Sequence, residues 1–154
     1  MTRTMSAIGL LLAAGLLTAA VAARRDDADA LIAGRQAAMK LSGTTFGSMK
    51  AAIDAGGDVT KLGFAAKALT DWGHAIPGMF PAGSDGGATK ALPTVWSDRA
   101  GFVKAAATYE AAAQKLGDLA KAGDAAGVAA QWTVVRGTCG ACHDTYRQPD
   151  KPRG

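Results

Sequence analysis

Apolar side chains recur along residues 27–146 at intervals of three, four and seven positions, as in helices that bury one face. Alanine is abundant, which favours helix, and no segment alternates convincingly between apolar and polar side chains. We therefore expect an all-α fold. The first expected helix covers 27–55 and turns one seam inward: Ile32, Arg35, Met39, Ser42, Phe46, Met49 and Ile53.

Two members of this seam, Arg35 and Ser42, are polar. A buried polar side chain needs a hydrogen-bonding partner. We therefore expect a polar group close to this face of the first helix.

Glycines and capping residues divide the rest of the chain into three more helices. Gly56–Gly57 ends the first helix and Asp58 is a good N-cap for the second, over 59–75. Ala122–Gly123 and Asp124 separate the third helix, which starts near Thr94 or Ser97, from the last. The faces expected to be buried are Val59, Leu62, Ala66, Leu69, Trp72 and Ile76; Phe102, Ala106, Tyr109, Ala113, Leu116 and Ala120; and Val128, Trp132, Val135, Cys139, Cys142 and Tyr146.

A long irregular stretch, 77–93, separates the second helix from the third. It holds three of the chain's five prolines and several glycines, so it is not a regular element. A connection of this length is either functional or bridges two distant helix ends. It suits the link between helices two and three of an up-down-up-down bundle.

The apolar stripe of the last helix runs into Cys139-Gly140-Ala141-Cys142-His143, which contains the only two cysteines of the chain. Cys-x-x-Cys-His is the attachment signal for c-type haem. The two thiols add to the vinyl groups of the porphyrin, and the histidine turns its imidazole onto the iron. Since cysteines three apart share one face of a helix, we expect one haem c at the end of the bundle core.

Three other roles of a Cys-x-x-Cys pair fit the sequence less well. A thioredoxin-like redox pair belongs among alternating strands and helices. A structural disulfide needs no histidine directly after the second cysteine. A zinc site needs two further ligands, and His74 is the only other histidine.

Residues 1–22 have the pattern of a secretory signal peptide, which leaves one domain over 23–154. Arg3 gives the positive start, 7–17 is apolar, and Ala20-Val21-Ala22 fits a cleavage site. The apolar run is shorter than the ~20 residues that span a bilayer, so we expect no stable membrane anchor. Export agrees with haem attachment outside the cytoplasm, and we expect the periplasm.

The chain carries 17 basic and 13 acidic residues, a net charge of +4. The basic residues are spread along the sequence without a clustered run, so we expect no nucleic acid partner. The charge is compatible with docking to acidic redox partner proteins but does not argue for it.

Haem attachment at the C-terminal end of a four-helix bundle resembles the class II c-type cytochromes, and cytochrome c′ most of all. The residues that match are Arg35-Gln36, Phe80-Pro81, Trp96 and the run from Cys139 to Arg147. The resemblance covers nearly all of 23–154. It implies an antiparallel up-down-up-down four-helix bundle that encloses one covalently attached haem c.

The resemblance also implies roles at the proximal side of the haem. Cys139 and Cys142 would form the thioethers, and His143 would be the proximal iron ligand. Arg147 lies four residues further on the same helical face, and it would influence which ligands reach the iron. Ordinary solvated charge is the other interpretation of Arg147, and both stay open.

Two residues of the first helix would contact the haem from the other side. The resemblance places Arg35 at a haem propionate and Gln36 at the haem edge. Solvated helix charge is the alternative for Arg35. We prefer the functional interpretation, because Arg35 interrupts an apolar seam.

Met39 lies four residues after Arg35 and would face the distal side of the iron. In cytochrome c′ proteins a bulky apolar residue there blocks the sixth position without bonding, which leaves a five-coordinate, high-spin iron that binds NO and CO. In low-spin members of the class a methionine of this helix ligates the iron, which suits plain electron transfer. A thioether serves either role, or it is one more core methionine.

We favour the five-coordinate form, because the loop after Phe80 and the tail after His143 are more similar to cytochrome c′. The expected function is electron transfer and binding of NO and CO, by a protein that is not an enzyme. The alternatives are a low-spin electron carrier, a haem enzyme such as a peroxidase, and a bundle without haem. A peroxidase needs a distal acid–base group, and the sequence offers none at this position. Family members often dimerise through their first two helices, so we also expect a homodimer.

Overall fold

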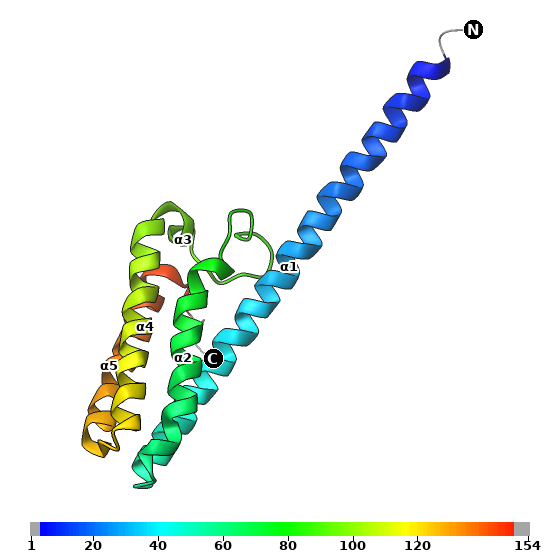
Figure 1. Cartoon of the computed structure of the whole chain (residues 1–154). Helices are drawn as coiled ribbons and strands as arrows, with labels where there is room; N and C mark the ends of the chain where they lie inside the picture. Colours follow the sequence, from blue (N-terminus) through cyan, green and yellow to red (C-terminus); the bar gives the residue numbers. More distant parts are fainter. Residues whose placement is uncertain (1–3, 150–154) are drawn as a thin grey trace, which may run out of the picture.

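The structure, a computed structural model, describes residues 4–149, with side chains from residue 24 onward. Helices make up most of it (Figure 1). In chain order the elements are α1 (Thr4–Asp54), η1 (Val59–Leu62), α2 (Gly63–Ala75), η2 (Ile76–Met79), α3 (Thr94–Ser97), α4 (Arg99–Lys121) and α5 (Ala125–Tyr146), where η marks a 3-10 turn.

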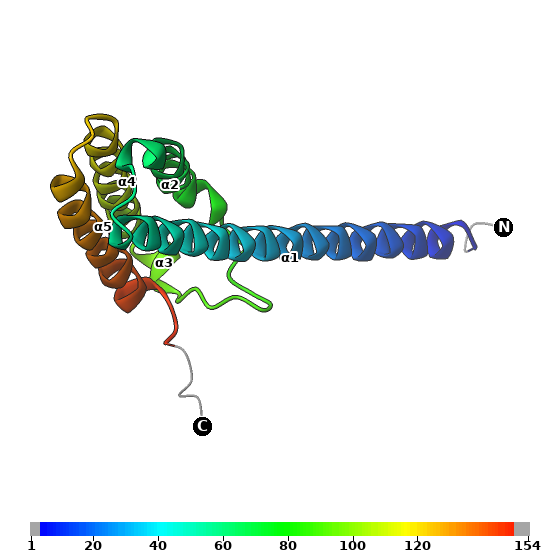
Figure 2. The same ribbon diagram turned by 90° about the horizontal axis from the view of Figure 1, so that it is seen from below.

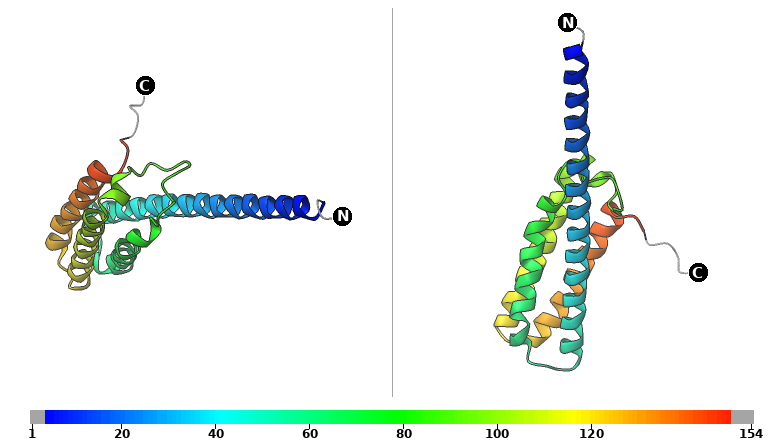
Figure 3. Two further views of the ribbon diagram at one scale, coloured as in Figure 1. Left: turned by 90° about the horizontal axis from the view of Figure 1, so that it is seen from above. Right: turned by 90° about the vertical axis from the view of Figure 1, so that its right-hand side faces the viewer.

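The long helices α1, α2, α4 and α5 run in alternating directions along the chain (Figures 1 and 3). Helix α4 packs against both α2 and α5, and α1 closes the bundle by contacting α2 and α5. This arrangement confirms the expected all-α, antiparallel up-down-up-down four-helix bundle.

Helix α1 is much longer than the expected first helix, with 51 residues in one continuous element. Its N-terminal part extends away from the bundle (Figure 2). The predicted signal segment, 1–22, begins in residues 1–3, which lie outside the described residues, and continues into this extension. Among the described residues, no helix has a stretch long and apolar enough to cross a membrane.

Aspartate side chains cap three of the elements, because a carboxylate oxygen can accept a bond from an unpaired N–H of the first turn. Asp58 accepts from the N–H of Thr60, and Asp124 accepts from that of Gly127, as their N-cap assignment predicts. Asp98 is a third cap, at the start of α4, and accepts from the N–H of Gly101.

The expected third helix begins at Thr94, within its predicted start, but it is two elements and not the single helix expected. Asp98 has φ −112° and ψ 57°, outside the helical region, and it separates α3 from α4. The second expected helix is also less regular than predicted. It begins as η1, continues as α2, and ends in the turn η2.

The expected inward faces form one core. Most of their members are buried, and the rest pack against the core while partly exposed, among them Met39, Phe46, Trp72, Trp132 and both cysteines. The largest side chains buried almost completely include Met49, Leu69, Leu116, Val95, Val128 and Val135.

Candidate haem site

Cys139 and Cys142 lie three residues apart near the C-terminal end of α5. Both are free thiols, half-buried, and both pack against the core of the bundle. Burial raises the pKa of each thiol, and the charge of Cys139 raises that of Cys142 further. The two thiols therefore face the interior, while His143 follows them at an exposed position.

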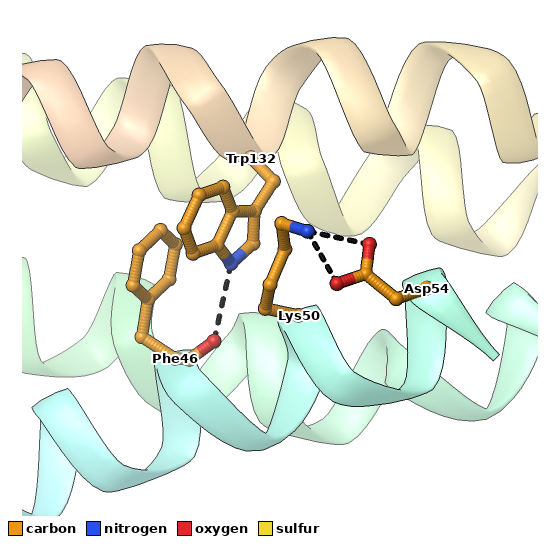
Figure 4. A network of polar contacts seen from close by, with 4 residues as sticks. All are labelled: Phe46, Lys50, Asp54 and Trp132. Carbon is orange, nitrogen blue, oxygen red and sulfur yellow. Dashed lines mark hydrogen bonds and ion pairs between the residues drawn. The ribbon is translucent and has the colours of Figure 1, made fainter.

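An aromatic contact between α1 and α5 lies further down the bundle (Figure 4). The rings of Phe46 and Trp132 stack with centroids 4.4 Å apart and planes 5° from parallel. The indole N–H of Trp132 donates a hydrogen bond of 3.1 Å to the carbonyl oxygen of Phe46. Lys50, which pairs with Asp54, lies beside the indole, with Nζ 5.6 Å from the ring centroid.

This contact fixes the register of α1 against α5. Because the two helices are antiparallel and each residue rises 1.5 Å, equal steps from Phe46 and Trp132 reach positions at the same level. Seven residues toward the N-terminus of α1 is Met39, and seven residues toward the C-terminus of α5 is Cys139. Met39 is half-buried against the core. The register therefore sets Met39 level with the start of the attachment motif.

Two tyrosines that the sequence pattern placed only in the core lie close to the thiols. Burial raises the pKa of Tyr109 on α4, and the charge of Cys139 adds to the effect, so the two groups lie within electrostatic range. Tyr146 donates a hydrogen bond of 2.8 Å to Asp98 Oδ2, which raises its pKa. The sequence signal for Tyr146 is its place four residues after Cys142. Tyr109 has no such signal, because its approach depends on the packing of α4 against α5.

Arg35 is only 2% exposed, and its polar partner is the long loop. The guanidinium lies over the ring of Phe80, with Cζ 4.3 Å from the centroid. The loop therefore supplies the polar group that the sequence predicts beside Arg35, and the contact with a propionate stays a prediction. The two terminal nitrogens donate four hydrogen bonds, to Met79 O (3.3 Å), Ser84 Oγ (2.8 Å), Ser84 O (2.8 Å) and Thr89 Oγ1 (2.7 Å).

Two further polar residues of α1 also have protein partners. Gln36 Nε2 donates a 2.7 Å hydrogen bond to the carbonyl oxygen of Ala88 in the same loop. Ser42 Oγ donates to the carbonyl oxygen of Met39 at 2.9 Å, within its own helix. Ser42 therefore needs no polar partner from elsewhere in the bundle.

Arg147 does not share a helical face with His143, which corrects the sequence prediction. Helix α5 ends at Tyr146, and Arg147 has an extended backbone with φ −129° and ψ 138°. Its N–H still donates to the carbonyl oxygen of His143 at 3.0 Å. The extended backbone instead forms an isolated antiparallel bridge with Ala91 of the loop.

The residues present fit a covalently attached haem. Two thiols at the spacing of the attachment signal face an apolar core, and an imidazole comes directly after them. The half-buried thioether of Met39 is level with them on the facing helix. This donor set would supply two thiols for thioether bonds, an imidazole nitrogen for the iron, and an apolar side chain on α1.

Comparison with known proteins points to one family. The model of the family described as "Cytochrome C'" matches residues 30–147. A cytochrome c-556 from Agrobacterium tumefaciens strain II Chrys is 35% identical over 116 residues, which cover 73% of this chain and 93% of that protein. A cytochrome c′ from Rubrivivax gelatinosus is 43% identical over 70 residues, 45% of this chain and 54% of that relative, so here the chain spans about half the relative's length.

The solved structures agree in fold. A nitric oxide complex of a mutant cytochrome c prime from Alcaligenes xylosoxidans has a TM-score of 0.73 and 28% sequence identity. The match covers 80% of this chain and 97% of that one. Proteins of the matching family carry one covalently attached haem c per chain, in agreement with the donor set on α5. The chain belongs to the cytochrome c′ family.

Proposed function

We propose that this chain is an exported haem protein whose five-coordinate, high-spin iron binds NO and CO on the side of Met39. Cys139 and Cys142 would form the thioethers, and His143 would be the proximal ligand. When bound, the haem supplies an iron that takes a small gas in its sixth position and changes its charge by one electron. The observation that carries the proposal is the register of α1 against α5, which sets Met39 level with the motif.

Met39 determines which ligands are favoured on the distal side. Its side chain is apolar, half-buried and packed against the core, so it offers no proton to a ligand and keeps water away. Peroxide cleavage wants an acid–base group in that place, whereas a small uncharged gas does not. An apolar Met39 at the level of the attachment motif therefore supports gas binding over peroxidase chemistry.

The comparisons support the choice of ligand. The cytochrome c prime of Alcaligenes xylosoxidans has been captured with nitric oxide in several mutant forms. These chains are about as long as the bundle described here, since the match covers 94–97% of each. We extend binding of this gas to the present chain.

Arg35, Gln36 and Arg147 complete the proposed site. Arg35 and Gln36 lie one turn from Met39 on α1, at the level where a propionate or the haem edge would lie. Arg147 follows the end of α5 and would lie on the proximal side, near His143. Their contacts with the haem remain predictions.

A second candidate function rests on the same methionine. A thioether level with the motif is also a possible sixth ligand, and His/Met ligation gives a low-spin electron carrier. One-electron exchange with redox partner proteins belongs to both candidates. Only the gas-binding form requires an open position.

Export and assembly also belong to the proposal. Residues 1–22 are a signal peptide, and the mature domain, 23–154, works in the periplasm without a stable membrane anchor. It forms a homodimer through α1 and α2. The exposed apolar side chains of these helices, Leu41 (68% exposed) and Phe64 (87% exposed), support dimerisation.

The test is the visible spectrum of the reduced, haem-loaded protein before and after addition of CO. We expect a broad high-spin Soret band that sharpens and intensifies with CO. Met39→Leu should keep this behaviour, because leucine also blocks the position without bonding. Met49→Leu is the matched control: Met49 is on the same helix, only 1% exposed, and ten residues from Met39.

Sharp α and β bands that ignore CO in the wild-type protein contradict the proposal. If Met39→Leu then restores CO binding while Met49→Leu does not, Met39 is the sixth ligand. The low-spin electron carrier is the correct function in that case.

A further inference from the structure

Residues 79–92 form a strap that joins α1 to the end of α5. At its first end and middle it is bound by Arg35 and Gln36 of α1. At its last end, the N–H of Leu92 donates to the carbonyl oxygen of Tyr146 at 3.0 Å, and the N–H of Gln148 donates to that of Lys90 at 2.8 Å. The strap therefore bridges the helix that carries Met39 and the residues that follow His143.

Arg35 is the residue that organises the strap. Its guanidinium reaches Met79, Ser84 and Thr89, which span most of the strap's length. Ser84 is itself 2% exposed, and its hydroxyl donates to the carbonyl oxygen of Pro81 while accepting from Arg35. The planar guanidinium holds its donors in a fixed fork that spans several oxygens, whereas the ammonium of a lysine is a compact charge with three rotatable donors and does not reproduce this geometry.

The charge of Arg35 is buried without a carboxylate. In the part of the chain that the structure describes, no ion pair joins Arg35 to an Asp or Glu side chain. Burial lowers the pKa of Arg35. Neutral oxygens of the strap and the face of Phe80 offset the desolvation of the cation. Burying this cation costs desolvation free energy, and nearly all the contacts that offset the cost are with the strap.

The position of Arg35 relates the strap to ligand entry. Arg35 and Met39 are one helical turn apart on the same seam, so the clamped strap lies about 6 Å along the helix from the proposed distal residue. Hydrogen bonds at both ends keep the strap across this end of the bundle. The strap therefore runs from α1 to the end of α5 on the Arg35 side of Met39.

We propose that Arg35 is a positioning residue that holds the strap closed and thereby slows the entry of small ligands to the distal side. This role rests on the proposed function, since it concerns the gas that the iron binds. This role differs from binding a propionate, because it depends on the hydrogen bonds that the terminal nitrogens of Arg35 donate to Met79, Ser84 and Thr89.

The experiment compares haem-loaded wild type with Arg35→Lys and Ser84→Ala. Arg35→Lys keeps the charge and loses the fork, and Ser84→Ala removes one acceptor without touching the arginine. Arg99→Lys is the matched control, because Arg99 of α4 donates to the carbonyl oxygens of Pro77 and Phe80, at the start of the loop and outside the measured residues 81–91. Two quantities are measured: amide hydrogen exchange over residues 81–91, and the rate of CO association with the ferrous protein.

We expect Arg35→Lys to speed exchange over 81–91 about tenfold or more, and CO association about threefold or more. Ser84→Ala should change both in the same direction by less. Arg99→Lys should leave CO association unchanged. The absorption spectrum of the CO complex should be the same in all four proteins, because no ligand of the iron is altered.

If Arg35→Lys and Ser84→Ala both keep the wild-type rate of amide hydrogen exchange over 81–91, Arg35 does not hold the strap. Faster exchange with an unchanged CO rate overturns the effect on entry, and an equal acceleration by Arg99→Lys overturns the assignment to Arg35. A wild-type protein that is inert to CO overturns the proposed function and the entry role with it. In that case the exchange measurement still reports separately whether Arg35 holds the strap.

Discussion

Trp132 joins α5 to α1 and is the most direct test of the register that defines the site. Its indole N–H bonds the carbonyl oxygen of Phe46, and the two rings stack at 4.4 Å. Trp132→Phe keeps a ring but removes the hydrogen bond, which costs about 1 kcal/mol. Trp132→Leu also removes the stacking, worth roughly 0.5–1.5 kcal/mol more. The total for leucine is therefore about 2 kcal/mol.

The assay is urea unfolding of the haem-loaded proteins, followed by far-UV circular dichroism. With a slope of roughly 2 kcal/mol per molar urea, the midpoint should fall by about 0.5 M for Trp132→Phe and about 1 M for Trp132→Leu. Lys67→Met on α2 is the control. Lys67 and its partner Asp71 are 70% and 62% exposed, and such a pair contributes under about 1 kcal/mol.

A double-mutant cycle separates this contact from the general loss of apolar area. Phe46→Leu and Trp132→Leu should be coupled by roughly 0.5–1.5 kcal/mol, because each removes the partner of the other. Additive effects, or a Trp132→Leu protein as stable as wild type, would refute the reasoning. The level position of Met39 would then lose its main support.

Three further predictions concern packing and ionisation. In protein made without haem, the two half-buried thiols should react with iodoacetamide at pH 8 more slowly than free cysteine does, and their rate should still be rising at a pH where that of free cysteine has levelled off, because burial raises their pKa. The raised pKa of Tyr109 favours the neutral phenol in the folded state, so its contribution to the free energy of unfolding is present below pH 10 and is lost as the pH rises further. The urea midpoint should therefore fall less above pH 10 in Tyr109→Phe than in wild type. Gly73→Ala should destabilise the bundle by roughly 1–3 kcal/mol in the same assay, since its new methyl would lie 2.8 Å from the Cα of Glu110, whereas Gly34→Ala, with nothing within 4 Å, should be neutral or stabilising. Equal effects of the two glycine substitutions would contradict the close approach of α2 and α4.

Local signals predicted the four long helices and most of their inward faces. Periodic apolar positions, Gly56–Gly57 and the caps Asp58 and Asp124 are all read from residues next to one another in sequence. The cap Asp98 was missed, because a helix start near Thr94 or Ser97 already agreed with the pattern. Its non-helical backbone places a second helix start five residues after the first.

Contacts between distant segments could not be predicted. The sequence indicates that Arg35 needs a polar partner, but the loop residues that provide it lie 44 to 54 positions away. The same limit applies to Trp132 and Phe46, which are 86 positions apart. The motif itself needed no such contact, since Cys139, Cys142 and His143 are adjacent on one helix.

Packing of α5 into the bundle and attachment of the haem both involve the sulfur atoms of Cys139 and Cys142. The folded bundle half-buries Cys139 and Cys142 against its core and raises the pKa of both thiols, so less thiolate is available to a vinyl group than in an undocked segment. Helix α5 packs on α4, its neighbour in the sequence, and contacts between sequence neighbours form early. We therefore expect haem attachment to be faster before the C-terminal segment docks, and variants that slow this docking should accept haem more completely than variants that hasten it.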